Sequence, residues 1–187
     1  SFSTSLFLIV YCTLSIMLAL QNKGSTSLTL DNDDIQIWIN CETQTDKQRD
    51  KARTMVVFSV KAEEGGAYGP FNSDRTMMYN TVITNIGDAY DKCTGVFTAP
   101  IAGVYHFTFF YHAGGHHVSK LILHKNKEPV VMTGDQGSGS DTADNGGNAV
   151  FLKLEKGDEV CVHLPAGAHV WASGGHTTFS GFLVNSC

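Results

Sequence analysis

The sequence lacks the dense positive charge that binding to nucleic acid requires. Its 187 residues hold 13 lysines and arginines against 18 aspartates and glutamates, which gives a net charge of -5 at pH 7. The basic residues are scattered, and a modest group between Lys47 and Lys61 is followed directly by Glu63 and Glu64. Phosphate backbones are bound by clustered lysine and arginine. We therefore expect no nucleic-acid partner.

The motifs of common catalytic and cofactor sites are also missing. No Gly-x-Ser-x-Gly elbow is present for nucleophilic catalysis, and no glycine-rich loop runs into Lys-Ser or Lys-Thr as a phosphate-binding loop does. The cysteines form no Cys-x-x-Cys pair, and the histidines do not follow the His-Glu-x-x-His spacing of zinc proteases. The sequence therefore predicts a protein with no catalytic residues and no cofactor, which is not an enzyme.

Two repeat patterns are absent from residues 21–54. There is no Gly-X-Y period, which excludes a collagen stalk, and residues 42–53 carry no sustained heptad for a coiled coil. The alternation around Ile35, Ile37 and Ile39 suits a strand better than a helix. Residues 42–53 are polar and contain neither glycine nor proline, so they are compatible with a short helix. We predict a short non-collagenous segment over residues 21–54.

The N-terminal residues carry no charge before Lys23, and residues 6–20 are almost entirely apolar. This run fits the ~7–15-residue core of a secretory signal at its upper end and falls short of the ~20 apolar residues of a membrane-spanning helix. We predict that residues 1–20 are a signal peptide, that the protein is secreted and extracellular, and that it makes no stable membrane insertion. An uncleaved anchor is the alternative. The chain begins at Ser1 rather than at a methionine, which leaves its true start open.

Secretion affects how the cysteines are interpreted. Cys12 would leave with the signal peptide, and the mature chain would keep Cys41, Cys93, Cys161 and Cys187. Four cysteines in an oxidising compartment allow three pairings, and the sequence does not choose between them. Cys41 precedes the strand-rich region, so we predict that it forms a disulfide between chains.

From Met55 onward, short runs of β-branched and aromatic residues are separated by glycine-rich turns. In residues 104–112, Tyr105, Phe107, Phe109 and Tyr111 share one face, as in a half-buried strand. Similar runs are residues 56–60, 79–86, 118–124, 129–132, 149–154, 159–164, 169–172 and 177–184, and residues 145–147 are among the predicted turns. No ten-residue segment here has helical spacing. The pattern predicts an all-β sandwich or jelly roll.

Two polar clusters are candidate metal sites. His112, His116 and His117 lie close together with His124 nearby, but adjacent histidines point to opposite faces of an extended chain and no cysteine or carboxylate is spaced to complete a site. Residues 134–147 hold three aspartates among glycine, serine and asparagine, and oxygen-rich loops suit calcium, but the spacing of an EF-hand is missing. We interpret both as exposed loops and assign no metal ligands, while a site built across chains stays open.

An ordered set of residues in this region resembles the C1q domain family. Phe58-Ser59-Val60 opens the set, a block from Asn85 to Phe107 forms its centre, and Phe179-Ser180-Gly181-Phe182-Leu183 closes it. The signature residues are Phe58, Asn85, Gly87, Tyr90, Gly95, Phe97, Gly103, Tyr105, Phe107, Gly157, Asp158, Phe179, Gly181 and Phe182. The resemblance identifies residues 55–187 as a C1q globular domain.

The resemblance implies a ten-stranded jelly roll, shared with proteins like tumour necrosis factor, that packs as a homotrimer. Its aromatic residues are expected to build the core between two sheets, namely Phe58, Tyr90, Phe97, Tyr105, Phe107, Phe179 and Phe182. Without a collagen stalk, the chain looks like the short-stalked cerebellin-like and fish C1q-like secreted proteins.

The function implied by the resemblance is multivalent recognition of extracellular protein or carbohydrate ligands, with innate-immune pattern recognition ahead of a cerebellin-like synaptic or adhesion role. A membrane-anchored ligand like tumour necrosis factor and a metal-dependent lectin are the rival classes. Loops on a rigid β scaffold carry binding, so the candidate ligand residues are Gly114, Gly115, His116, His117, Asp135, Asp141 and Asp144. The resemblance leaves open a weakly bound calcium ion and implies no other cofactor.

Overall fold

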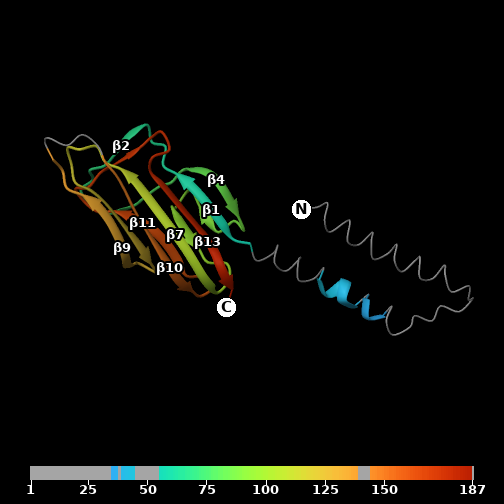
Figure 1. Ribbon diagram of the computed structural model, residues 1–187. Coiled ribbons are helices and arrows are strands. Elements are labelled where there is room, and N and C mark those ends of the chain that lie inside the picture. Colours follow the sequence, from blue (N-terminus) through green and yellow to red (C-terminus); the bar gives the residue numbers. More distant parts are fainter. Residues whose placement is uncertain (1–34, 38, 45–54, 139–143, 187) are drawn as a thin grey trace, which may run out of the picture. The chain divides into compact units, whose positions relative to one another are not determined.

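The computed structural model describes residues 35–37, 39–44, 55–138 and 144–186 of the chain (Figure 1). The residues from Thr54 onward form one compact unit and those up to Arg53 another. The predicted signal peptide, residues 1–20, lies outside the described residues, as does Asp141.

The strand expected around Ile35, Ile37 and Ile39 is wrong, because residues 35–37 and 39–44 are helical. The three isoleucines are 36%, 55% and 43% exposed, so the apolar alternation does not mark a buried face of a sheet. A helix satisfies its backbone groups internally, whereas a strand needs a partner strand. Within this helix, the Thr43 hydroxyl donates to the Ile39 carbonyl at 2.7 Å.

The compact unit after Arg53 is built from antiparallel strands. In chain order they are β1 (Val57–Lys61), β2 (Gly66–Tyr68), β3 (Arg75–Thr76), β4 (Thr81–Ile86), β5 (Tyr90–Asp91), β6 (Val96–Thr98), β7 (Gly103–His112), β8 (Ser119–Lys125), β9 (Glu128–Asp135), β10 (Asn145–Leu154), β11 (Glu159–Leu164), β12 (Val170–Ala172) and β13 (Thr178–Ser186). These strands outnumber the ten that the resemblance implies. The reason is that they include very short segments such as β3 and β5, which have two residues each.

Two main sheets form the domain (Figure 1). One has the strand order β10-β7-β13-β1-β4, and the other has the order β5-β6-β11-β8-β9 with β3 on β11. A small third sheet pairs β12 with β2. Strands distant in sequence, such as β1 and β13, are neighbours, and this arrangement confirms the predicted all-β jelly-roll sandwich.

Aromatic rings fill the space between the main sheets. Phe58, Phe97, Phe107 and Phe179 are at most 1% exposed. The ring centroid of Phe58 lies 5.2 Å from that of Phe97 and 4.9 Å from that of Phe179, distances at which aromatic rings attract one another. The predicted core residues are therefore confirmed, with one exception.

The exception is Phe182, which was expected in the core but is 44% exposed. Side chains alternate between the two faces of a strand. Phe179 and Gly181 of β13 are buried, so Phe182 lies on the opposite, outward face. The closing motif marks the strand correctly, but the register of β13 decides which of its aromatic residues is buried.

The turn expected at residues 145–147 is also wrong, because these residues begin strand β10. Gly146 lies opposite Tyr111 and Gly147 opposite Phe110 in the neighbouring strand β7. A side chain at either glycine would collide with the ring of that neighbour. The glycines therefore serve close packing of rings against the backbone rather than a change of chain direction.

Signature residues that are not in the core hold turns in place. The Asn85 side chain donates to the Tyr90 carbonyl at 2.9 Å and accepts from the Tyr90 amide at 3.3 Å, and it thereby closes the turn between β4 and β5. Gly87 within this turn has φ of 89°, a conformation that favours glycine. Asn85 and Gly87 therefore belong to the signature because the backbone of this turn requires them.

Candidate functional site

The outward face of the β10-β7-β13-β1-β4 sheet carries an exposed apolar row. Strand pairing places His106 of β7 between Phe151 of β10 and Phe182 of β13, and Val57 of β1 and Ile86 of β4 continue the same line. Phe151 is 65% exposed, Phe182 44% and Ile86 45%. We call these five residues the apolar row.

Val184, two residues after Phe182 on β13, is also exposed, at 48%. The next row along the sheet has small or hydroxyl-bearing side chains, with Ser59 and Ser180 hydrogen-bonded through their hydroxyls at 2.9 Å. Single chains rarely expose contiguous apolar patches larger than a few hundred Å² unless another molecule covers them. This sheet face is therefore a candidate protein contact surface.

The two predicted ligand loops meet at one end of the domain. The Ser138 amide donates to the Gly115 carbonyl at 3.0 Å, and the Ala113 amide donates to the Asp144 carbonyl at 2.7 Å. His116 and His117 are exposed, whereas Gly115 is buried. Asp135 ends strand β9 and is half-buried. The structure thus brings the described residues of both loops together and leaves the histidine side chains facing solvent.

A cavity of about 210 Å³ adjoins these loops. It is lined by residues at the start of β8 and the end of β9, together with their flanks: Val118, Ser119, Lys120, Met132, Thr133, Gly134, Asp135 and Gln136. Gly134 lies opposite Lys120 in the β8–β9 pair, and a side chain at this position would collide with the Ser119 carbonyl oxygen. Pockets for drug-sized ligands occupy roughly 300–1,000 Å³, so this one fits only a small group. No pattern in the sequence predicted this cavity.

The histidines considered as metal ligands are separated in the structure. His112 stacks on His176 with ring centroids 4.7 Å apart, His117 contacts His169 at 5.3 Å, and His124 stacks on His163 at 4.1 Å; these are three distinct pairs. Within residues 35–37, 39–44, 55–138 and 144–186, no three histidine, cysteine or acidic side chains are grouped to hold a metal ion.

Two histidines of these pairs are pushed toward their neutral form. Burial lowers the pKa of His163, and the neighbouring His124 lowers it further. Burial likewise lowers the pKa of His169, with added effects of His117 and His116. Two protonated imidazoles close together repel each other, which adds to the preference of His163 and His169 for the neutral form.

The described cysteines do not provide an activated nucleophile. Burial, with a smaller effect of Glu159, raises the pKa of Cys161 to about 11, so its sulfur stays a thiol at neutral pH. Its Sγ lies 3.4 Å from Nε2 of His163. Cys93 is an exposed free thiol, and Cys41 is disulfide-bonded. Its predicted link between chains stays a prediction.

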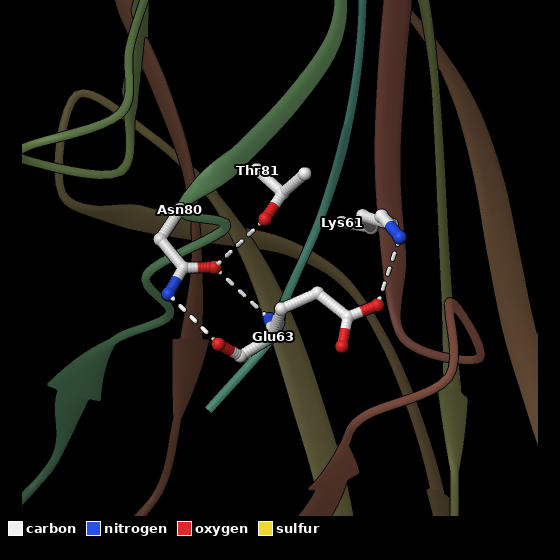
Figure 2. A network of polar contacts seen from close by, with 4 residues as sticks. All are labelled: Lys61, Glu63, Asn80 and Thr81. Atoms are coloured by element: carbon white, nitrogen blue, oxygen red, sulfur yellow. Dashed lines mark hydrogen bonds and ion pairs between the residues drawn. The ribbon is translucent and has the colours of Figure 1, made fainter. Parts of the chain in front are cut away.

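Polar contacts fix the ends of the strands that carry the apolar row. Figure 2 shows Asn80, before β4, accepting from the Glu63 amide at 3.0 Å and donating to the Glu63 carbonyl at 3.1 Å. The Lys61 ammonium pairs with the Glu63 carboxylate at 2.9 Å, and this contact is the main reason why the pKa of Glu63 is lowered. Thr81 completes the group. The network ties the end of β1 to the start of β4.

A second polar network holds the turn before β11. The Asp158 carboxylate accepts from the Asn126 amide group at 2.8 Å and from the Glu155 backbone amide at 2.9 Å, and it pairs with Lys125 at 3.0 Å. The hydrogen bond from Asn126 is the largest of the causes that lower the pKa of Asp158 to about 2. The signature residue Asp158 is therefore structural.

Comparison with known proteins identifies relatives of this domain. The C1q domain family model matches residues 57–184. Complement C1q tumor necrosis factor-related protein 3 of Mus musculus and that of Homo sapiens are each 35% identical over 115 residues, which cover 60% of this chain and 46% of the relative. Caprin-2 of Danio rerio is 29% identical over 138 residues, 70% of this chain and 14% of the relative. The chain thus spans less than half the length of these curated relatives.

Solved structures share the fold. The globular domain of zebrafish complement 1qA protein superimposes with a TM-score of 0.56 at 24% identity, over 71% of this chain and 99% of that one. The tumour necrosis factor Eiger of S. frugiperda gives a TM-score of 0.59 at 12% identity, over 72% of this chain and 96% of that one. Among the described residues, no helix is both long enough and apolar enough to span a membrane.

Proposed function

Because the chain belongs to the C1q domain family, we propose that it is a secreted recognition protein that works as a homotrimer. The C1q and tumour necrosis factor-like class is a non-enzymatic class of ligand-binding domains, and its members form trimers. The observation that carries the proposal for this chain is the exposed apolar row on the β10-β7-β13-β1-β4 sheet.

Two further copies of the chain are the proposed partners of this face. Contacts around a threefold axis are heterologous, so one surface of each chain meets a different surface of the next. Burying an exposed phenylalanine contributes roughly 1.5–3 kcal/mol, and Phe151 and Phe182 supply two such side chains per chain. Together with Ile86, they supply an apolar contribution that favours assembly.

Ligand binding is proposed at the joined loops around His116 and His117 and at the adjoining cavity. The loops stand on rigid strands, which is the arrangement in which variable segments bind partners. A trimer would present three copies of the site, so weak single contacts would add to a strong multivalent one. We propose innate-immune pattern recognition as the role, in which the ligands are repetitive microbial surfaces.

The trimer is tested by sedimentation equilibrium of the full chain with and without reductant. We expect a trimer in reductant, and a multiple of three without reductant if Cys41 links trimers. Phe151→Asp should yield single chains because it places a charge in the apolar row. The matched control is Ala67→Asp, which adds the same charge to an exposed alanine of β2 outside this sheet. A wild-type monomer would contradict the proposal.

Ligand recognition is tested by surface plasmon resonance on immobilised lipopolysaccharide and peptidoglycan. We expect the double variant His116→Ala, His117→Ala to lose binding, while Lys156→Ala in an exposed turn keeps it. Unchanged binding by the loop variant would remove these loops from the site. Adding EDTA tests the calcium ion that the family resemblance leaves open, and a loss of binding would assign the contact to a metal.

A further inference from the structure

His106 is the one ionisable residue in the apolar row. Its imidazole centroid lies 4.4 Å from the ring of Phe151 and 5.4 Å from that of Phe182, so its two neighbours across the sheet are both phenylalanines. The side chain is only half-buried in the single chain. A second copy seated on the row would bury it together with both rings.

We propose that His106 makes the trimer acid-labile, so that assembled chains separate when the pH falls far enough to protonate the imidazole. The inference rests on the proposed trimer and concerns how that contact is regulated. Histidine is the side chain that ordinarily changes charge between about pH 5 and 8. Burying an imidazolium costs much more than burying a neutral imidazole. Protonation therefore favours separate chains, in which His106 keeps contact with water.

The strand pairing shows which side chains lie around His106. Its own strand β7 places Val104 and Thr108 on the same face, and β13 contributes Ser180 and Asn185 in the adjoining rows. From β10, the adjoining rows contribute Ala149 and the cation Lys153. Lys153 is the one charged side chain that these strands place next to His106 on this face. These strands place no carboxylate in the rows next to His106 to stabilise an imidazolium.

The phenylalanine rings do not oppose this effect. A cation near an aromatic face is attracted to it, and Phe151 and Phe182 offer such faces to His106. Both rings belong to the same chain as His106, so this attraction is present before and after assembly. It therefore does not favour the trimer, whereas the loss of water occurs only on assembly.

Dissociation of the trimer is expected to depend steeply on pH because each trimer contains three copies of His106. If each chain takes up one proton on separation, the dissociation constant of the trimer rises by up to ~1,000-fold for each pH unit below the titration of the imidazole. A change from about pH 7.5 to about pH 5.5 should therefore convert trimers to single chains at micromolar concentration.

The test is sedimentation velocity of the full chain in reductant at these two pH values, with near-UV circular dichroism to confirm that the chains stay folded. We expect wild type to be trimeric at the higher pH and monomeric and folded at the lower. His106→Phe should stay trimeric at both, and His106→Gln, which is polar but does not titrate, should give one pH-independent association constant. His124→Gln, in a histidine pair on the other sheet, is the matched control and should behave as wild type.

The other outcomes would overturn the inference in distinguishable ways. A wild type that is trimeric at both pH values, or a His106→Phe variant that dissociates as wild type does, removes His106 as the sensor and leaves the trimer intact. Unfolded chains at the lower pH would assign the effect to acid denaturation. A wild type that is monomeric at about pH 7.5 would overturn the trimer itself.

Discussion

At the scale of single residues, buried polar groups decide local stability. Ser119 is fully buried, and its hydroxyl has no hydrogen-bond partner among the residues that the structure describes. A buried hydroxyl without a partner costs about 1–3 kcal/mol. We expect Ser119→Ala to leave the free energy of unfolding unchanged or to raise it by up to about 1 kcal/mol, measured by urea denaturation.

The matched control for Ser119 is Ser59→Ala, because the Ser59 hydroxyl bonds to that of Ser180 at 2.9 Å. Its removal should lower the free energy of unfolding by about 0.5–1.5 kcal/mol. Equal losses in the two variants would mean that the Ser119 hydroxyl is bonded in solution.

Asp158 gives a prediction on acid stability. Its pKa of about 2 in the folded chain lies below that of a free aspartate. Folding therefore favours the ionised form, and this contribution is complete above about pH 4 and is lost as the pH falls toward 2. We expect Asp158→Asn to be less stable than wild type at neutral pH, with the difference shrinking toward pH 2. Chemical denaturation at several pH values measures it, and a pH-independent difference would contradict the role of charge.

At the scale of strands, the glycines at the start of β10 are the element that sequence patterns misjudge. A glycine cluster ordinarily marks a turn, but here Phe110 of β7 lies against Gly147. The strand continues because the space that a side chain would occupy is filled by a ring from the neighbouring strand. The structure therefore identifies these glycines as packing positions.

We expect Gly147→Ala to lower the free energy of unfolding by about 1–3 kcal/mol, because the added methyl group forces the Phe110 ring away. A double-mutant cycle measures this coupling by thermal or urea denaturation. In the Phe110→Ala background the same glycine substitution should cost less, and the remaining cost comes from contact of the new methyl group with the Phe109 carbonyl oxygen. An equal cost in both backgrounds would mean that backbone conformation, rather than the ring, requires glycine.

At the scale of the whole molecule, the proposed trimer links stability to concentration. Chains that associate when folded gain stability by mass action, so the melting temperature should rise with chain concentration. For three associating chains, a tenfold increase contributes about 0.9 kcal/mol per chain, or roughly 2–5 °C for a domain of this size. Calorimetry over a hundredfold concentration range measures it. Phe151→Asp, which removes the apolar contact, should show no dependence on concentration.

The sequence by itself determined the class of fold and the family. Alternation in residues 104–112 marked β7, because side-chain direction along a strand is a local property. The ordered signature identified the domain, since its aromatic residues and turn residues such as Asn85 and Gly87 are set by the fold. The short strands β3 and β6 were missed because two or three residues are usually too few to show a pattern, although the three-residue β12 was found within the predicted run 169–172.

Only the tertiary structure decided which residues share a surface. Phe182 and Phe179 look alike in sequence, yet strand pairing buries one and places the other beside His106 and Phe151. The histidines likewise appear as a cluster in sequence and form separate pairs in space. Contacts between strands far apart in the chain depend on sheet order and register, and no local pattern of residues encodes them.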